Sequence, residues 1–184
     1  VMKRCIGEMH MDEVTICYGM TATSPVSTQT LTDDPIDKRV STVGRVHPHV
    51  EVEVIDPRTG LVVERGETGE LCTRGYSVML GYWNDPEKTA VRFKPAPGRD
   101  PGIQTGELAV FSGDIVKADE EGFLYFVGRN DEMIKTSGYR VSPAEVEEVV
   151  YGTGLVRDAV ALGVDDPRLG QRIVLVASGE NLDK

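Results

Sequence analysis

The sequence has little cysteine, few basic residues and no long apolar run, and each shortage excludes a class of protein. The three cysteines form no C-x-x-C pair, which argues against a disulfide framework and favours reduced thiols in the cytoplasm. Lys and Arg number 20 against 30 Asp and Glu, for a net charge of -10, so no basic surface for nucleic acid is expected. The longest apolar runs, such as residues 173–177, fall far short of the roughly 20 residues of a membrane helix. The first residues show no signal-peptide pattern.

The composition that remains can form a packed core. Hydrophobic residues make up 40% of the 184-residue chain and charged residues 27%, which is typical of folded proteins. The length suggests one domain, or one domain with a small neighbour. The acidic balance does not exclude nucleotides, because their phosphates are held by local backbone groups rather than by net charge.

Short strands separated by glycine turns dominate the pattern. Val50–Ile55 alternates Val and Glu with the period of two that a half-buried strand requires. The other predicted strands are Glu13–Cys17, Leu61–Glu64, Glu70–Thr73, Glu107–Ser112, Ile115–Ala118, Phe123–Val127, Ala159–Val164 and Arg172–Ser178. The strands before residue 130 predict a small antiparallel barrel or meander.

A first helix is predicted over Asp85–Phe93. Asn84 or Asp85 is its capping residue, and Pro86 stands in the first turn, where its missing N–H costs little. The Pro- and Gly-rich stretch 95–102 that follows is expected to be a loop of low order.

A second helix is predicted over Pro143–Tyr151. Ser142 and Glu145 form the S-x-x-E pattern of a capping box, with Pro143 as the first helical residue. Three valines of this helix are expected to face a core, namely Val146, Val149 and Val150.

The pattern changes near Asn130-Asp131. Beyond this point come a strand, the capped helix and two further strands around a Pro/Gly turn, which is typical of the start of a separate α+β unit. We therefore predict an α+β fold with a domain boundary at about residue 130. The chain contains no internal repeat or low-complexity tract.

The run Tyr18-Gly19-Met20-Thr21 lies where a strand is expected to end. An aromatic face there can stack on a base, while a hydroxyl and backbone N–H groups can hold a phosphate. An isolated run of this kind is more often an ordinary glycine turn.

Asp114, Arg129 and Lys135 follow at wider spacing. Asp114 comes after an apolar strand, and a carboxylate there can accept hydrogen bonds from both hydroxyls of a ribose. Arg129, fifteen residues later, has a planar and permanently charged fork that suits ribose or phosphate. Lys135 precedes Thr136-Ser137-Gly138-Tyr139, where glycine lets a narrow group pass close to the backbone. Each residue alone is more simply a solvated side chain, and their order and spacing carry the prediction.

Two other polar groups are interpreted as surface. His47 and His49 have no second cluster of ligands, so a metal pair is not expected. The glutamates of the second predicted helix are interpreted as its solvated face.

Together these stretches resemble the adenylate-forming superfamily of acyl-CoA synthetases, nonribosomal adenylation domains and luciferases. The segments RGYSVMLGYW and MIKTSGYRVSPAEVEEVV resemble acyl-CoA synthetases more than adenylation domains. The segment YGMTATSPVSTQT is closest to medium- and long-chain fatty acyl-CoA ligases. The similar segments run in family order and are YGMTATSPVSTQT (18–30), GELCTRGYSVMLGYWNDPEKTAVRF (69–93), SGDIVKADEEGFLYFVGRNDEMIKTSGYRVSPAEVEEVV (112–150) and VALGVDDPRLGQRIVLV (160–176).

The resemblance implies a role for each matching residue. Tyr18 stacks on adenine, and Thr21 contacts the α-phosphate. Asp114 binds both ribose hydroxyls, with Arg129 in support. The implied nucleotide site is Tyr18, Gly19, Met20, Thr21, Asp114 and Arg129.

The resemblance also implies two domains that move. Residues 1–130 correspond to the C-terminal part of the AMP-binding large domain, with its barrel-like subdomain, and residues 131–184 to a truncated lid domain. Asp131 is then the hinge, and Thr21 and Lys135 are the catalytic residues. The region for CoA and thioester formation is Lys135, Ser137, Gly138 and Tyr139.

The implied reaction activates a carboxylic acid, with fatty acids favoured. The acid attacks the α-phosphate of Mg-ATP to give acyl-AMP, and the CoA thiolate then displaces AMP. ATP or AMP, Mg²⁺ and CoA are thus the expected cofactors. The expected partners are the acid, CoA and a missing N-terminal part of the same protein.

Three departures from the family pattern leave an alternative open. The family has a Glu near Mg²⁺ where this sequence has Ala22, so we assign no metal ligand and predict that Ala22→Glu raises the adenylation rate. The phosphate-binding loop and the lid lysine are not found in the sequence, so the 184 residues alone are expected to be inactive. The alternative is a degenerate module that binds a nucleotide or a partner without catalysis.

Overall fold

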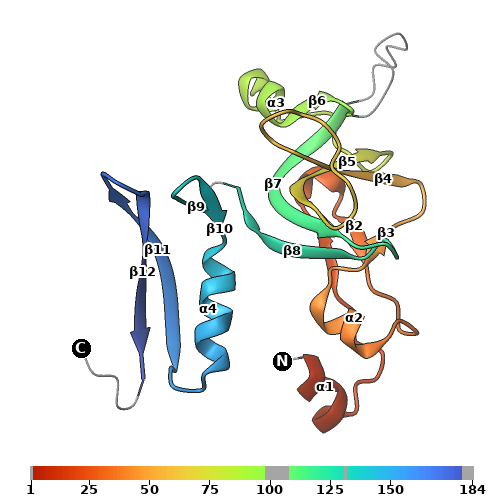
Figure 1. The fold of residues 1–184 in the computed structure, drawn as a ribbon. Coiled ribbons are helices and arrows are strands. Elements are labelled where there is room, and N and C mark those ends of the chain that lie inside the picture. Colours follow the sequence, from red (N-terminus) through yellow and green to blue (C-terminus); the bar gives the residue numbers. More distant parts are fainter. Residues whose placement is uncertain (1, 98–107, 131, 180–184) are drawn as a thin grey trace. The chain divides into compact units, whose positions relative to one another are not determined.

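The computed structural model describes residues 2–97, 108–130 and 132–179, and its internal contacts divide the chain into two units, Val1–Phe126 and Val127–Lys184 (Figure 1). Both units mix helices with antiparallel strands, which confirms the predicted α+β class. The assignment of the two units to a large domain and a lid stays a prediction.

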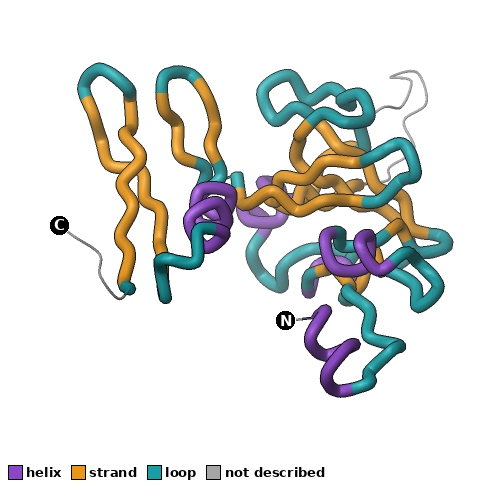
Figure 2. Tube along the Cα trace, turned by 60° about the horizontal axis from the view of Figure 1, so that its bottom comes forward, coloured by secondary structure: helices purple, strands orange, loops and turns teal. Residues whose placement is uncertain are grey.

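The first unit is strand-rich. A three-stranded sheet has the order β1-β2-β3, and a five-stranded sheet has the order β4-β5-β7-β6 with β8 paired to β7. The larger sheet is antiparallel and curls into a half-barrel (Figure 2). The elements are α1 (Met2–Met9), β1 (Cys17–Gly19), β2 (Val26–Gln29), α2 (Ile36–Ser41), β3 (Arg45–Val46), β4 (Val50–Ile55), β5 (Thr68–Gly75), α3 (Pro86–Arg92), β6 (Phe93–Pro95), β7 (Leu108–Ala118) and β8 (Leu124–Arg129), with a 3₁₀ turn over Thr21–Thr23.

The core of the first unit forms between the curled sheet and its neighbours. Val54, Leu71, Val116 and Leu124 make one buried cluster, against which Tyr18 packs. These residues come from β4, β5, β7 and β8, so closing the sheet removes their apolar side chains from water. The cluster thereby links the strand that carries Tyr18 to the strands of the half-barrel.

The second unit is a four-stranded antiparallel sheet with one helix. Its strand order is β10-β9-β12-β11, and α4 packs against β11, where Ala159 and Ala161 are buried. The elements are β9 (Ile134–Thr136), β10 (Tyr139–Val141), α4 (Pro143–Gly152), β11 (Asp158–Asp166) and β12 (Gly170–Ser178).

The local predictions hold best where the pattern is regular. The predicted strand Val50–Ile55 is β4 with the same bounds. The first predicted helix is α3, and Asp85 caps it by accepting from Lys88 N at 2.9 Å. The second is α4.

Several local predictions are wrong. Residues 13–16 are not a strand, and 61–64 contribute only an isolated bridge between Val62 and Ile55. Ser142 makes no side-chain cap, because its hydroxyl donates to Val127 O at 2.6 Å instead. None of the three valines of α4 is buried, and Val149 is 73% exposed.

No helix in the described residues is long and apolar enough to cross a membrane.

Candidate nucleotide site

Tyr18 and Asp114, two residues predicted to bind a nucleotide, are in direct contact in the first unit. The Tyr18 hydroxyl donates to Asp114 Oδ2 at 2.6 Å, although 96 residues separate them in the chain. Tyr18 is the middle residue of β1, and Asp114 lies within β7 with 7% of its surface exposed. An aromatic face beside a carboxylate is an arrangement that can hold a base together with its ribose.

A β-bulge between β5 and β7 sets the backbone at Asp114. The register shifts so that Leu71 alone on β5 faces residues 112–114 of β7. Gly113 has φ of +79°, which glycine adopts without strain, and its N–H donates to Glu70 Oε1 at 2.9 Å. The Ser112 hydroxyl donates to Leu71 O and accepts from Asp114 N. The expectation that Asp114 lies beyond a strand end is therefore wrong, because the bulge re-aims the chain inside a continuous strand.

Gly19 lets β1 approach the turn that follows it. A Cβ atom at Gly19 would lie 1.6 Å from Pro25 O, so no larger residue fits this backbone. Thr23 closes the turn, because its hydroxyl accepts from Met20 N at 3.1 Å and lies within hydrogen-bond distance of the Met20 and Pro25 carbonyls. Thr21 stands exposed on this turn. Thr23 was missed at the sequence level, since a hydroxyl that bonds only to backbone leaves no motif.

Ala22, where the family has Glu, is 5% exposed and packs against Phe93 and Val110. A carboxylate here has to turn away from these apolar side chains or be buried at a cost in free energy. Among the described residues, no group of three or more His, Cys, Asp or Glu is arranged to hold a metal ion.

Cys72, on β5 beside the bulge, is not a candidate nucleophile. Burial raises the pKa of its thiol, and the nearby Glu70 carboxylate raises it further. The residue is 1% exposed, so it stays a protonated side chain of the core.

The other predicted residues belong to the second unit or its border. Arg129 ends β8, and its Nε lies 4.0 Å from Glu132 Oε1. Next to it, Asn130 Oδ1 accepts from Arg140 Nη1 of β10 at 2.7 Å. Asp131, the predicted hinge, lies outside the described residues.

Lys135 to Tyr139 form a hairpin. Thr136 pairs with Tyr139, so Ser137 and Gly138 are a two-residue turn, with φ of 49° and 84°. Positive φ at both positions is the geometry of a type I′ turn, which glycine favours. The side chains of Lys135 and Tyr139 are exposed, and Lys135 N donates to Gln171 Oε1 at 2.7 Å. The hairpin thus presents a cation and an aromatic ring to solvent on a fixed backbone.

Comparisons of the sequence and structure with known proteins identify a family. Residues 1–83 match the family model described as AMP-binding enzyme. The chain belongs to this family. It is 37% identical over 173 residues, 94% of its length, to the medium-chain acyl-CoA ligase ACSF2, mitochondrial, of Bos taurus, of which it spans 26%.

Two solved structures of adenylate-forming enzymes have the same fold. ATP-bound MatB from Rhodopseudomonas palustris is 30% identical with a TM-score of 0.79, over 92% of this chain and 32% of that one. The o-succinylbenzoate coenzyme A synthetase MenE from Bacillus subtilis, in complex with ATP and magnesium ion, is 26% identical with a TM-score of 0.74, over 94% of this chain and 33% of that one. The predicted resemblance is thereby confirmed, and the roles of individual residues stay predictions.

Proposed function

We propose that this chain is part of an AMP-forming ligase that activates a carboxylic acid with ATP and transfers the acyl group to CoA. The chain spans about a quarter to a third of the proteins it matches, and the activity is proposed for the whole protein rather than for these 184 residues alone. The observation that carries the proposal is the contact between Tyr18 and Asp114. It joins an aromatic ring to a nearly buried carboxylate in a family whose solved members include ATP-bound structures.

In this proposal each residue of the site has one task. The ring of Tyr18 stacks on adenine beside Gly19 and Met20, and the exposed Thr21 hydroxyl donates to the α-phosphate. The Asp114 carboxylate accepts from the ribose hydroxyls while Tyr18 holds it in place. Arg129 adds its charge to the ribose and phosphate. Positioning of this kind lowers the barrier because it fixes the α-phosphate for attack.

The reaction that follows has two balanced steps. A carboxylate oxygen of the acid forms a bond to the α-phosphorus, and the bond to pyrophosphate breaks. The CoA thiolate then attacks the acyl carbonyl carbon, and AMP leaves. In the second step the exposed hairpin from Lys135 to Tyr139 borders the path of the pantetheine arm, and Asp131 is the hinge that brings it there. When bound, Mg²⁺ neutralises charge on the phosphates.

A fatty acid is our proposed substrate, because the relative ACSF2 is named a medium-chain acyl-CoA ligase. The mammalian relative is named mitochondrial, whereas we propose the cytoplasm for this protein on its thiols alone. A second candidate function is a module that binds nucleotide without catalysis. Ala22 favours it, since its packing against Phe93 and Val110 leaves an apolar surface where the family has a carboxylate.

The test is pyrophosphate release by the full-length protein with ATP and acids of increasing chain length. Release that depends on the acid, with a maximum at one chain length, supports the ligase and names its substrate. ATP binding without release for any acid favours the non-catalytic module. Asp56→Asn is a suitable control, because it removes a carboxylate of the same unit that follows β4 and pairs with the exposed Arg58 rather than with the proposed site.

A further inference from the structure

Arg39, on α2, is a buried cation whose partners are backbone carbonyls. It is 7% exposed, and its guanidinium donates to Asp12 O at 2.6 Å, Val14 O at 2.5 Å and Thr32 O at 3.2 Å. Two of these carbonyls belong to the irregular segment 12–16, which leads directly into β1 and Tyr18.

The partners of Arg39 are unusual for a buried charge. Within the described part of the chain it makes no ion pair, and its Nε finds no hydrogen-bond partner. Burying a cation costs desolvation free energy unless its hydrogen bonds or ion pairs offset that cost. The planar guanidinium, with its five N–H donors, can hydrogen-bond several carbonyl oxygens at once. The geometry therefore indicates that Arg39 fixes the segment 12–16.

The opposite side of this segment is held by the end of β2. Thr30 Oγ1 accepts from Ile16 N at 2.9 Å, and Thr30 N donates to Ile16 O at 2.9 Å. Gln29 Nε2 also donates to Thr15 Oγ1 at 3.0 Å. The chain that enters β1 is thus held between α2 and β2, and little freedom remains for the residue two positions on, Tyr18.

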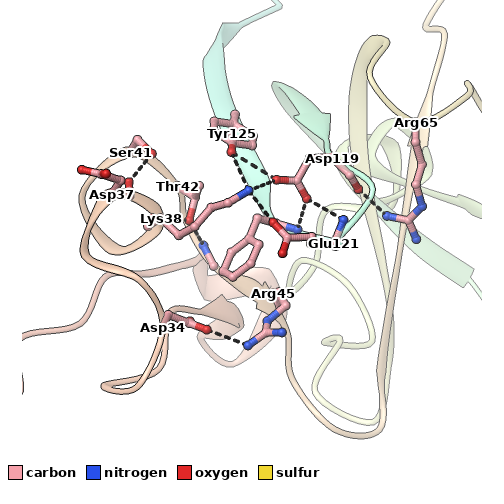
Figure 3. A network of polar contacts seen from close by, with 12 residues as sticks. Asp34, Asp37, Lys38, Ser41, Thr42, Arg45, Arg65, Asp119, Glu121 and Tyr125 are labelled. Carbon is pink, nitrogen blue, oxygen red and sulfur yellow. Dashed lines mark hydrogen bonds and ion pairs between the residues drawn. The ribbon is translucent and has the colours of Figure 1, made fainter.

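The neighbouring residue Lys38 reaches in another direction. Consecutive helical residues point about 100° apart, so adjacent cations of α2 serve different partners. Lys38 Nζ lies 2.5 Å from Asp119 Oδ2, 2.8 Å from Glu121 Oε2 and 3.2 Å from the Tyr125 hydroxyl (Figure 3). These residues surround the turn between β7 and β8, and β7 carries Asp114. Helix α2 therefore contacts two segments: residues 12–16, which lead into Tyr18, and the turn after β7, the strand that carries Asp114. Tyr18 and Asp114 are in turn in contact with each other.

We propose that Arg39 is a positioning residue for the nucleotide site, which fixes the segment 12–16 so that Tyr18 stays against Asp114. The inference rests on the proposed function, because it assigns Arg39 to the binding of ATP. Arg39 acts through the backbone of β1 and does not touch the nucleotide.

The experiment compares full-length variants by equilibrium binding of AMP and by the KM for ATP and for the acid. Arg39→Met removes all three carbonyl contacts, and Arg39→Lys keeps the charge with fewer of them. Thr30→Val loosens the same segment from the other side with almost no change in volume. Arg45→Met is the matched control, because it breaks the 2.6 Å contact with buried Asp34 and none with residues 12–16.

The proposal predicts that Arg39→Met and Thr30→Val weaken AMP binding and raise the KM for ATP about tenfold, the factor that 1.4 kcal/mol supplies. The KM for the acid stays unchanged, since a loss confined to nucleotide binding affects one substrate. Arg39→Lys recovers part of the affinity, and Arg45→Met loses stability but keeps wild-type AMP affinity.

Two other results overturn it. If the Arg39 and Thr30 variants lose only the amount of active protein, with AMP affinity and KM for ATP like those of Arg45→Met, Arg39 is merely structural. Should Arg39→Met fail to fold, Thr30→Val and Arg39→Lys still decide the point. A wild-type protein that binds AMP but turns over no acid refutes the ligase alone, whereas one that binds no nucleotide overturns both proposals.

Discussion

Gly19→Ala is expected to separate β1 from its neighbours, and the magnitude follows from one distance. The added Cβ would lie 1.6 Å from Pro25 O and 2.8 Å from Val26 Cα. Side-chain Cβ atoms essentially never come within 3.0 Å of another heavy atom, so the two chain segments have to move apart by at least 3.0 - 1.6 = 1.4 Å. The obstacle is backbone and cannot rotate away.

We expect Gly19→Ala to cost about 3 kcal/mol, the upper part of the range for overpacking, and therefore to lower the Tm. Tyr18 moves with the strand, so AMP affinity falls as well. Thermal unfolding and equilibrium AMP binding of the full-length protein measure the two effects.

The matched control is Gly7→Ala. A Cβ at Gly7 meets no atom within 4 Å, and the residue lies in helix α1, where alanine is favoured over glycine by about 1 kcal/mol. A Gly19→Ala protein with the Tm and AMP affinity of the wild type would refute the reasoning, since it would mean that β1 does not approach Pro25 as closely as described.

Three further predictions use the same unit. Asp114→Asn keeps an acceptor for the Tyr18 hydroxyl but loses the charge, so the KM for ATP rises about 10- to 100-fold with the Tm little changed, as steady-state kinetics with a melting curve can check. Ala22→Glu raises the adenylation rate in pyrophosphate exchange while lowering the Tm, because its stem enters an apolar cluster; an unchanged rate means that another carboxylate serves Mg²⁺. For Asp119, burial raises the pKa, but hydrogen bonds from Lys38, Phe123 N and Tyr125 outweigh it and the pKa falls below its ordinary value. A lowered folded pKa stabilises the fold above the unfolded pKa, and this contribution is lost as the pH falls through the folded pKa. Asp119→Asn is therefore less stable than wild type at pH 7, and the difference in Tm shrinks as the pH falls below the ordinary pKa of an aspartate, as Tm measured against pH will show.

The sequence predicted elements whose signals are local. The Val and Glu alternation of β4 and the Asp85-Pro86 start of α3 need only neighbouring residues, and both are present. Tyr18 and Asp114 were selected as partners of one nucleotide, but their contact across 96 residues depends on the curl of the larger sheet.

Other features depend on tertiary contacts that leave no local pattern. Ser142 has the pattern of a capping residue, yet the carbonyl of Val127 is the better-placed partner for its hydroxyl. The sequence around Gly113 suggests the end of a strand, whereas the structure has a bulge there. Glycine is common both at strand ends and in bulges, so the sequence does not distinguish them. No local sequence pattern predicts the role of Arg39, since its three acceptors are backbone carbonyls from two other segments.

The most direct test of the central claim is photochemical labelling of the full-length protein with 8-azido-ATP, followed by mapping of the labelled peptide. If Tyr18 stacks on adenine, the label falls on the peptide that contains Tyr18, excess ATP prevents it, and Asp114→Asn reduces it. Labelling that is confined to other peptides, or that ATP does not prevent, would contradict the assignment of the Tyr18 and Asp114 pair as the nucleotide site.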